Sequence, residues 1–464
     1  MVNDLTLADA ISSANTGLDA IKRAPIVDED TGIKCIRIQD VNQKKQFLDW
    51  GNTQVEDRNF EKFQLKENDI LVARTGGSIG SNKFINSKLP AVFNNGLIRV
   101  RIDEEKHNPK FIYYLLQTEA FKSHINAIAF STSAQPNMKI KDFLRFEFKE
   151  IGLEAENNVE NILTKLDDKI ELNHQTNQTL EKMAQSLFKS WFVDFDQVFD
   201  NALANGMVVN DFPEALQEKA EQRQQVQQSI AAGELDYKQL PEDIRQLFPS
   251  EFEQVDDLVM GVDGWVPKGW KIKTIDELNK INPESWTKKN SPKEVRYVDL
   301  ANAKNGRILG TVEYSFEDAP SRARRILKPH DTIIGVVRPA NRSFAYINET
   351  GLTGSTGFAV VRPVEEYLRA FTYLSLTTDD SINEFARIAD GAAYPAIKPQ
   401  DVAKAICLYS SEQILKKFEV IAGEFINKKS ANEQQQKPLA ELRDALLPKL
   451  ISGELTLPTT KDGV

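Results

Sequence analysis

The feature that most constrains this fold is an internal duplication, because a repeated sequence must build the same supersecondary plan twice. The 464-residue chain matches itself at an offset of 259 or 260 residues. Matching positions are Phe111, Tyr113, Leu116 and Thr118 with Phe371, Tyr373, Leu376 and Thr378, and Pro136, Lys139 and Asp142 with Pro395, Lys398 and Asp401. Upstream, LKENDILVAR (65–74) aligns with LKPHDTIIGVVR (327–338). Duplication predicts pseudo-symmetry; two tandem domains of any function would also satisfy it.

Each half follows one order of elements. Short β-like runs (IKCIRI, DILVAR and GLIRVR; then VRYVDL, DTIIGVV and FAVV) precede a helical pattern, at 111–126 and again at 371–388. A loop containing proline and a long helix follow. We therefore predict an α/β (α+β) fold of two repeated domains joined by two long antiparallel coiled-coil helices with pseudo-twofold symmetry. The expected segments are a first domain (1–150), a central long helix (151–196), an acidic linker or insertion (197–264), a second domain (265–410), and a C-terminal helix with its tail (411–464).

Both long helices carry a heptad stripe, since apolar positions alternate in steps of three and four. The stripes are Val159, Leu163, Leu166, Ile170, Asn173, Asn177, Leu180, Ala184, Leu187 and Trp191, and Phe418, Ala422, Phe425, Lys429, Asn432, Gln436, Leu439, Arg443, Leu446 and Leu450. Antiparallel packing places Asn173 and Asn177 near Gln436 and Asn432, where paired amides fix the helix register. Packing of each helix on its own domain is the alternative, and Lys429 and Arg443 weaken the seam. Two similar domains on a spacer suit two DNA half-sites, which lie roughly 34–36 Å apart.

The net charge of −10 is unevenly distributed. Residues 1–150, 151–264, 265–410 and 411–464 carry +1, −15, +4 and 0. The acidity therefore belongs to one central stretch, and DNA-facing surfaces remain possible elsewhere. The start of the chain lacks the basic and apolar regions of a signal peptide, and no apolar run reaches 18 residues. With only two distant cysteines, Cys35 and Cys407, the expected location is the cytoplasm.

Several segments resemble the specificity subunit of type I restriction–modification systems. They are ARTGGSIGSNK (73–83), TSAQPNMKIKDF (132–143), LFKSWFVDFD (187–196), GWVPKGWKI (264–272) and LRDALLPKLISGEL (442–455). The resemblance covers nearly the whole chain except 197–262. It implies two target recognition domains that read a bipartite, asymmetric DNA sequence, and two helices that set the spacing. It also implies docking of two methylation (M) subunits and of restriction (R) subunits, with S-adenosylmethionine, ATP and Mg²⁺ on those partners and no cofactor on this chain. The chain departs from the pattern at ADGAAYPAIK (389–398) and RPANRS (338–343), which puts the half-site identities in doubt.

No catalytic residues are expected, because the chain has neither a methyltransferase Asn/Asp-Pro-Pro-aromatic motif nor a P-loop lysine. Candidate DNA contacts instead lie on three kinds of segment. The glycine-rich loop and its counterpart supply Arg74, Ser78, Ser81, Asn82 and Lys83, and Arg338, Asn341 and Arg342. The proline loops supply Thr132, Gln135 and Asn137, and Tyr394 and Lys398; the SRARRI run supplies Arg322, Arg324 and Arg325. These residue types bind phosphates and base edges, but tight turns and a solvated basic strand would explain the same patterns.

An aromatic patch closes the first long helix: Phe188, Trp191, Phe192 and Phe195. It is either an internal staple onto the first recognition domain or a docking face for a methylation subunit. The acidic, glutamine-rich segment after it is expected to be a solvated linker or insertion that repels DNA, and contact with a basic face of a partner is the alternative. Two alternatives to DNA recognition stay open: a protein-only coiled-coil adaptor, and a self-contained enzyme, which the missing motifs disfavour.

Overall fold

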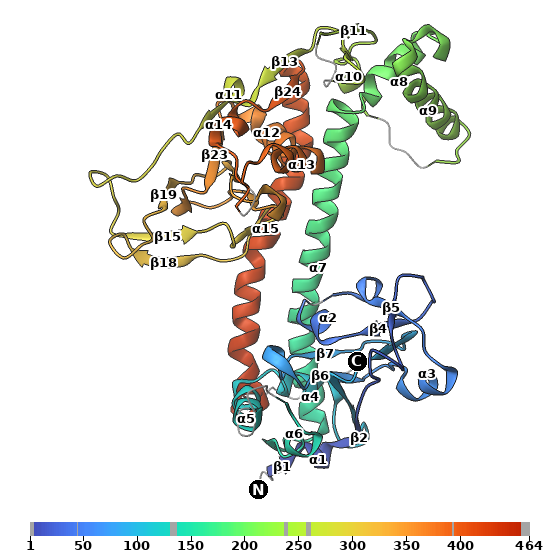
Figure 1. Cartoon of the computed structure of the whole chain (residues 1–464), viewed down its shortest axis with the longest axis vertical. Coiled ribbons are helices and arrows are strands. Elements are labelled where there is room, and N and C mark those ends of the chain that lie inside the picture. The colour runs from blue at the N-terminus through green and yellow to red at the C-terminus, as the bar shows by residue number, and fades with distance from the viewer. Residues whose placement is uncertain are drawn as a thin grey trace, which may run out of the picture. The chain divides into compact units, whose positions relative to one another are not determined.

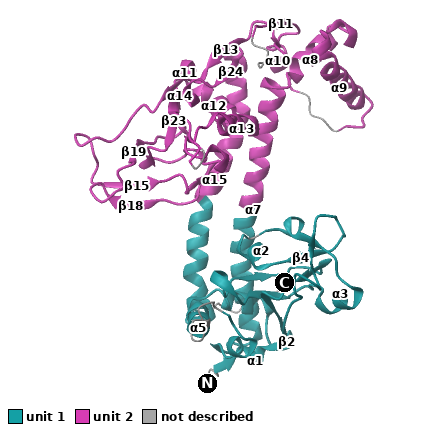
Figure 2. Ribbon diagram, viewed as in Figure 1, with its two compact units in different colours: residues 1–172, 435–464 teal, residues 173–434 magenta. Residues whose placement is uncertain are grey.

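The structure is a computed structural model that describes residues 4–43, 45–129, 137–235, 240–256, 261–391 and 394–455 (Figure 1). It divides into two units, coloured separately in Figure 2. Unit 1 comprises residues 1–172 and 435–464, and unit 2 comprises residues 173–434. Both division points fall inside the two long helices, so each helix contributes residues to both units.

Unit 1 is built on two four-stranded sheets. The first has the order β2 (Ile11–Thr16), β9 (Leu97–Ile102), β6 (Ile70–Ala73) and β7 (Asn82–Phe84), and all its pairs are antiparallel. The second has the order β3 (Ile26–Val27), β5 (Gly51–Thr53), β4 (Lys34–Ile36) and β8 (Ala91–Phe93), and β4 runs parallel to β8. A separate pair joins β1 (Asp4–Thr6) to β10 (Glu147–Lys149). The helices are α1 (Leu7–Ala10), α2 (Ile38–Asn42), α3 (Asp57–Phe63), α4 (Pro109–Leu115), α5 (Glu119–Ala129), α6 (Ile140–Phe143) and the first part of α7 (Leu153–Phe192).

Unit 2 repeats this plan. One sheet has the order β14 (Asn279–Ile281), β23 (Phe358–Pro363), β20 (Thr332–Gly335) and β21 (Phe344–Tyr346). The other has the order β18 (Val312–Ser315), β15 (Glu294–Val298), β22 (Leu352–Ser355) and β19 (Ala323–Ile326), with β15 parallel to β22. Three two-stranded pairs join β13 (Lys271–Thr274) to β24 (Ile406–Tyr409), β16 (Ala303–Lys304) to β17 (Arg307–Ile308), and β11 (Phe252–Gln254) to β12 (Trp265–Pro267). The helices are α11 (Ile275–Leu278), α12 (Arg369–Thr377), α13 (Asp379–Ile388), α14 (Pro399–Ala403) and most of α15 (Glu412–Ile451).

The predicted duplication is confirmed by topology and by side-chain detail. In both units the second sheet contains one parallel pair, β4–β8 and β15–β22, with an antiparallel strand, β5 or β18, beside its first member. The fourth strand differs, because β3 pairs with β5 in unit 1 whereas β19 pairs with β22 in unit 2. A fully buried aspartate precedes β6 and β20, and each accepts a hydrogen bond from an arginine of the neighbouring strand. The distances are 2.6 Å from Arg101 Nε to Asp69 Oδ1 and 2.7 Å from Arg362 Nε to Asp331 Oδ1. The same charged link therefore holds the first sheet of each unit.

The sequence predicted one helical segment in each half, over 111–126 and 371–388. The structure has two helices at each place, α4 and α5 in unit 1 and α12 and α13 in unit 2. The break lies at a threonine whose hydroxyl accepts a backbone N–H of the following helix. Phe121 N donates to Thr118 Oγ1 at 3.3 Å, and Ser381 N donates to Thr378 Oγ1 at 3.2 Å. A threonine cap competes with continuation of the preceding helix, which explains the split.

The long helices α7 and α15 each span 40 residues and run antiparallel to one another within each unit. In unit 1, Val159 and Leu163 of α7 share a core with Leu447 and Leu450 of α15. In unit 2, the core instead joins the C-terminal end of α7 to the N-terminal part of α15, around Phe418. The antiparallel arrangement predicted from the heptad stripe is thus present in both units.

The acidic segment after α7 is folded over its described residues, so of the two expected forms it is an insertion and not a solvated linker. It contains α8 (Asp196–Ala204), α9 (Glu214–Ala231) and α10 (Glu242–Arg245). Phe199, Phe212 and Leu216 are buried and belong to the main core of unit 2. Apolar residues at helical spacing supply this packing, while the acidic side chains that dominate the composition lie mostly on the exposed faces.

Candidate nucleic-acid interface

In unit 1, the two loops predicted to contact DNA lie against each other. Thr75 and Asn137 form an isolated antiparallel bridge, and Met138 N donates to Arg74 O at 2.8 Å. The Arg74 guanidinium donates from Nη2 to Asn137 Oδ1 at 3.1 Å and from Nε to Met138 O at 3.3 Å. Arg74 is therefore oriented by neutral oxygens of the second loop. The predicted residues Thr132 and Gln135 lie outside the described residues.

Other predicted residues of this loop hold unit 1 together. Asn82 Nδ2 donates to Leu116 O at 2.8 Å, and Lys83 Nζ donates to Lys45 O at 3.2 Å. The Ser78 hydroxyl accepts from Asn42 Nδ2, and the backbone of Ser81 pairs with Ala73 and Ser78. The structure therefore brings Arg74 and Asn137 into contact with each other and gives Asn82 and Lys83 contacts within the unit.

The equivalent loops of unit 2 are joined in the same way. Arg338 N donates to Pro395 O at 2.7 Å, and the Arg338 guanidinium lies 4.7 Å from the centre of the Tyr394 ring. Arg338 is exposed, and Tyr394 is 71% exposed. Lys398 is exposed at the start of α14, where its backbone N–H donates to Asp401 Oδ2 at 2.6 Å. An arginine stacked on a tyrosine is therefore presented to solvent.

Backbone hydrogen bonds correct the sequence alignment of the two loops. Three hydrogen bonds of unit 1 have an equivalent in unit 2. In unit 1 they run from Ala73 N to Ser81 O, from Arg74 N to Gly96 O and from Met138 N to Arg74 O. Their equivalents in unit 2 run, in the same order, from Gly335 N to Ser343 O, from Val336 N to Gly357 O and from Ile397 N to Val336 O. By this register, Arg74 corresponds to Val336. The sequence alignment of Arg74 with Arg338 is therefore wrong by two residues. Matching the two arginines required a two-residue insertion before Arg338, whereas the backbone keeps a constant offset from Asp69 and Asp331 to Ser81 and Ser343.

The register places Arg338 opposite Gly76 and Arg342 opposite Gly80. All four residues have left-handed backbone conformations, with φ of +76° and +88° at the glycines and +49° and +55° at the arginines. A left-handed conformation costs a residue with a β-carbon about 1–2 kcal/mol, which glycine avoids. Sequence reasoning missed this exchange because it becomes visible only when backbone angles are known.

The remaining predicted residues of this loop are tied to their neighbours. Arg342 Nε donates to Asn305 Oδ1 at 3.0 Å, and its Nη2 lies 2.7 Å from Asp379 Oδ1. The carbonyl of Asn341 accepts from Lys304 Nζ at 2.8 Å. These contacts connect the loop to the β16–β17 pair and to the start of α13.

The predicted arginine cluster lies on and beside β19. Arg322 is exposed, while the Arg324 guanidinium lies 4.6 Å from the Phe316 ring centre. Arg325 is partly buried and donates from Nη1 to Ser285 Oγ at 3.2 Å. Burial lowers the pKa of Arg325, and no carboxylate contributes to that shift.

The aromatic patch does not form a docking face. Phe188, Trp191, Phe192 and Phe195 are all buried in unit 2. The Phe192 ring lies 4.9 Å from that of Phe418 and 5.1 Å from that of Phe371, and Trp191 packs edge-on against Phe248 at 5.0 Å. The docking interpretation is therefore corrected: these rings are an internal staple. They pack within unit 2, not onto the first recognition domain, because α7 ends among the elements of the second repeat.

Polar residues occupy the middle of the helix seam. In unit 2, Asn432 Nδ2 donates to Asn177 Oδ1 at 2.8 Å, and both side chains are buried, as is Asn173. Gln436 lies in the part of α15 that belongs to unit 1. The amide pair has the position that antiparallel packing requires.

Two charged contacts were missed by sequence reasoning. Lys429 Nζ lies 2.7 Å from Glu181 Oε2 in unit 2, and Arg443 Nη1 lies 2.9 Å from Asp167 Oδ1 in unit 1. A tyrosine hydroxyl also binds each carboxylate: Tyr373 donates to Glu181 Oε1 at 3.1 Å and Tyr114 donates to Asp167 Oδ2 at 2.7 Å. The available signal was spacing, because both the acids and the bases recur after two heptads. Lys429 and Arg443 are therefore compensated within the seam.

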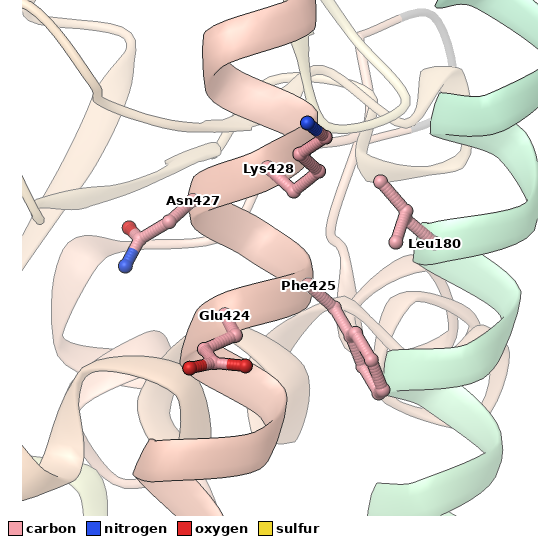
Figure 3. A pocket seen from close by; sticks show the side chains of 5 residues that line it. All are labelled: Leu180, Glu424, Phe425, Asn427 and Lys428. Carbon is pink, nitrogen blue, oxygen red and sulfur yellow. The ribbon is translucent and has the colours of Figure 1, made fainter.

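An open groove lies between α7 and α15 in unit 2 (Figure 3). Leu180 points toward α15 and Phe425 points toward α7, while Glu424, Asn427 and Lys428 complete the lining (Figure 3). Within the described part of the chain, no group of three or more His, Cys, Asp or Glu side chains is placed to hold a metal. Among the described helices, none is long and apolar enough to cross a membrane.

Comparisons with known proteins agree with this architecture. Residues 20–182 match the family model described as the type I restriction modification DNA specificity domain. The chain is 27% identical over 409 residues to the type I restriction enzyme HindI specificity subunit of Haemophilus influenzae, covering 85% of this chain and 88% of that one. It is 23% identical to the MjaIX specificity subunit of Methanocaldococcus jannaschii, covering 80% and 74% of the two chains.

A solved structure has the same fold. The S subunit of a type I restriction–modification system from M. genitalium aligns with a TM-score of 0.54 at 15% identity, covering 97% of this chain and 96% of that one. The sequence similarity to these specificity subunits extends over most of this chain, and the repeated two-sheet architecture is the fold of a type I restriction–modification S subunit.

Proposed function

We propose that this chain is the non-catalytic subunit that selects the DNA target of a type I restriction–modification complex. Each unit reads one half of a bipartite, asymmetric sequence through the paired loops that follow β6 and α5, or β20 and α13. The observation that supports this most directly is the repeated pair of loops. Each copy presents an arginine with a polar or aromatic partner, Arg74 with Asn137 and Arg338 with Tyr394, although the two arginines are two positions apart in the loop.

The two helices provide the second part of the proposal. Because α7 and α15 each contribute to both units, they can set the separation of the two half-sites. Two methylation subunits and the restriction subunits dock on this chain and carry S-adenosylmethionine, ATP and Mg²⁺. The groove between Leu180 and Phe425 offers apolar surface for such a partner.

A map of methylated bases in the source cell, with and without this gene, tests the proposal. Removal of the gene is expected to abolish methylation at one interrupted DNA sequence, and the full-length chain supplied in trans is expected to restore it. An unchanged map would contradict the proposal and favour a protein-only adaptor. Methylation or cleavage by the isolated chain would contradict the non-catalytic assignment.

A further inference from the structure

The loop after the third strand of each first sheet needs two left-handed residues, and the two units meet this need differently. Unit 1 uses Gly76 and Gly80, whereas unit 2 uses Arg338 and Arg342. A β-carbon at Gly76 would meet nothing within 4 Å, so open space surrounds that position. Glycine is needed at this position only for its left-handed backbone. Glycine at the equivalent position of unit 2, where Arg338 stands, would adopt the same conformation at a lower free-energy cost.

Arginine at a left-handed position is therefore retained for what its side chain does. Strained residues that persist in a fold are often found at binding sites, where a side chain must be held in one direction. The strain alone identifies no ligand, and the contacts of the two arginines separate their roles.

Arg342 positions the loop. Its guanidinium is held between Asn305 Oδ1 and Asp379 Oδ1, at 3.0 Å and 2.7 Å. The Asn305 backbone N–H in turn donates to Arg342 O at 3.0 Å. This side chain is used inside unit 2.

Arg338 has a different environment. Its guanidinium lies on the exposed ring of Tyr394, and its backbone N–H donates to the carbonyl of Pro395, the next residue. The stack therefore joins the two loops and holds a planar, forked donor at the surface. A rigid arginine of this kind suits a planar acceptor pair, and bidentate binding to guanine O6 and N7 is the commonest specific arginine contact in the major groove.

We propose that Arg338, stacked on Tyr394, is a specificity-determining residue of unit 2 that binds the major-groove edge of a guanine in the half-site read by that unit. The inference rests on the proposed function and deepens it, because it assigns one base contact to one residue. Unit 1 has glycine at this position, so its half-site is read without an equivalent contact.

Arg338→Gly is the decisive variant, because it removes the side chain and relieves the backbone strain together. The full-length chain, assembled with its methylation subunits, is tested against randomised duplex DNA at two salt concentrations. We expect a melting temperature equal to or above that of the wild type, and a loss of affinity for the selected target of about 10- to 100-fold. The loss should be confined to a guanine at one position of one half-site.

Arg338→Lys and Arg387→Ala complete the set. Lysine keeps the charge but loses the fork and the stack, so it should relax the same position while leaving the salt dependence unchanged. Arg387 is an exposed arginine on α13 that pairs with Glu384, so its removal makes the same change in charge and should leave target choice unchanged.

The outcomes are distinguishable. Wild-type affinity and selectivity in Arg338→Gly would overturn the assignment, as would uniform weakening on all sequences with a shallower salt dependence, which indicates a phosphate contact. A lowered melting temperature with unchanged selectivity would make Arg338 a structural residue. If the wild-type complex selects no sequence at all, the proposed function itself fails.

Discussion

At the scale of single residues, hydrogen bonding and burial shift the pKa values of two histidines in opposite directions, so both make the stability depend on pH. His107 is buried beside the start of α7, and its Nδ1 lies 2.8 Å from Oε1 of the fully buried Glu156. The second carboxylate oxygen accepts from Asn108 N at 2.7 Å. The hydrogen bond to Glu156 raises the pKa of His107 above its usual 6.5. In unit 2, burial instead lowers the pKa of His330.

These opposite shifts give opposite pH profiles. A histidine whose folded pKa is raised contributes stability below pH 6.5 and loses it as the pH rises through the folded pKa. We therefore expect His107→Gln to lower the free energy of unfolding by about 1–3 kcal/mol near pH 6, with the deficit shrinking toward pH 8. Chemical denaturation across this range measures it.

His330→Asn is the control of opposite sign, since asparagine tolerates the left-handed conformation at this position, where φ is +74°. The free energy of unfolding of His330→Asn should be below that of the wild type near pH 8, and this difference should shrink as the pH falls below 6.5. If the stability of both variants relative to the wild type changed with pH in the same direction, the opposite pKa shifts assigned to His107 and His330 would be contradicted.

Residue types that bind DNA could be chosen from the sequence, but their roles could not. Asn82 and Lys83 have the right chemistry and are used inside unit 1. Arg338 was chosen for its charge, whereas its left-handed backbone and its stack on Tyr394 depend on angles and on contacts between distant segments. The amino-acid sequence read along the chain shows neither the backbone angles nor these contacts.

At the scale of elements, the heptad stripe predicted the two long helices and their antiparallel pairing. It also implied that Lys429 weakens the seam, because a lone buried ammonium is costly. The structure supplies its compensation: Glu181 from α7, the carbonyl of Gly306 at 3.2 Å, and the ring of Tyr373 at 5.8 Å. The stripe shows only one helix face, so partners from flanking positions and other elements escape it.

Removing only one partner of the Lys429–Glu181 pair should lower the free energy of unfolding more than replacing both partners together. Lys429→Met leaves the Glu181 carboxylate without its cation, and we expect a loss of about 3 kcal/mol in the free energy of unfolding. Glu181→Gln with Lys429→Met should recover most of that loss, because glutamine still offers an oxygen to the Tyr373 hydroxyl. Denaturant unfolding of the two single variants and the double variant gives the coupling.

Lys416→Met provides the matched control on the same helix. Lys416 pairs with Glu412 one turn away, and both side chains are more than half exposed. Its replacement should cost less than about 1 kcal/mol. Equal losses at Lys416 and Lys429 would show that burial adds nothing to the seam pair.

At the scale of the whole molecule, most of the predicted architecture followed from the internal duplication. The order of strands and helices in one half predicts that of the other, and the matching strand orders of the two first sheets confirm this. The aromatic end of α7 was harder to place, because its partners Phe371 and Phe418 lie about 180 and 230 residues further along the chain. Apolar periodicity identifies a buried face without naming what covers it.

The proposed spacer role makes a prediction that the helix register allows to be tested cleanly. Residues 168–174 of α7 and 436–442 of α15 lie between the Asp167–Arg443 pair of unit 1 and the Asn177–Asn432 pair of unit 2. Removing both segments deletes one heptad from each helix and leaves both pairs opposite their partners. At ~1.5 Å per residue this shortens the helices by roughly 10 Å, or about three base pairs.

We expect the double deletion to keep both half-sites and to shorten the unread gap between them, as measured by sequencing the duplexes that the assembled complex selects. Deletion from α7 alone should abolish selection, because the pairs no longer face each other. His174→Ala controls for the lost contact between His174 and Arg307, and should leave the gap unchanged. A double-deletion complex that binds with the original gap would show that the helices do not set the spacing, since a shortened support cannot hold two reading surfaces at the same separation.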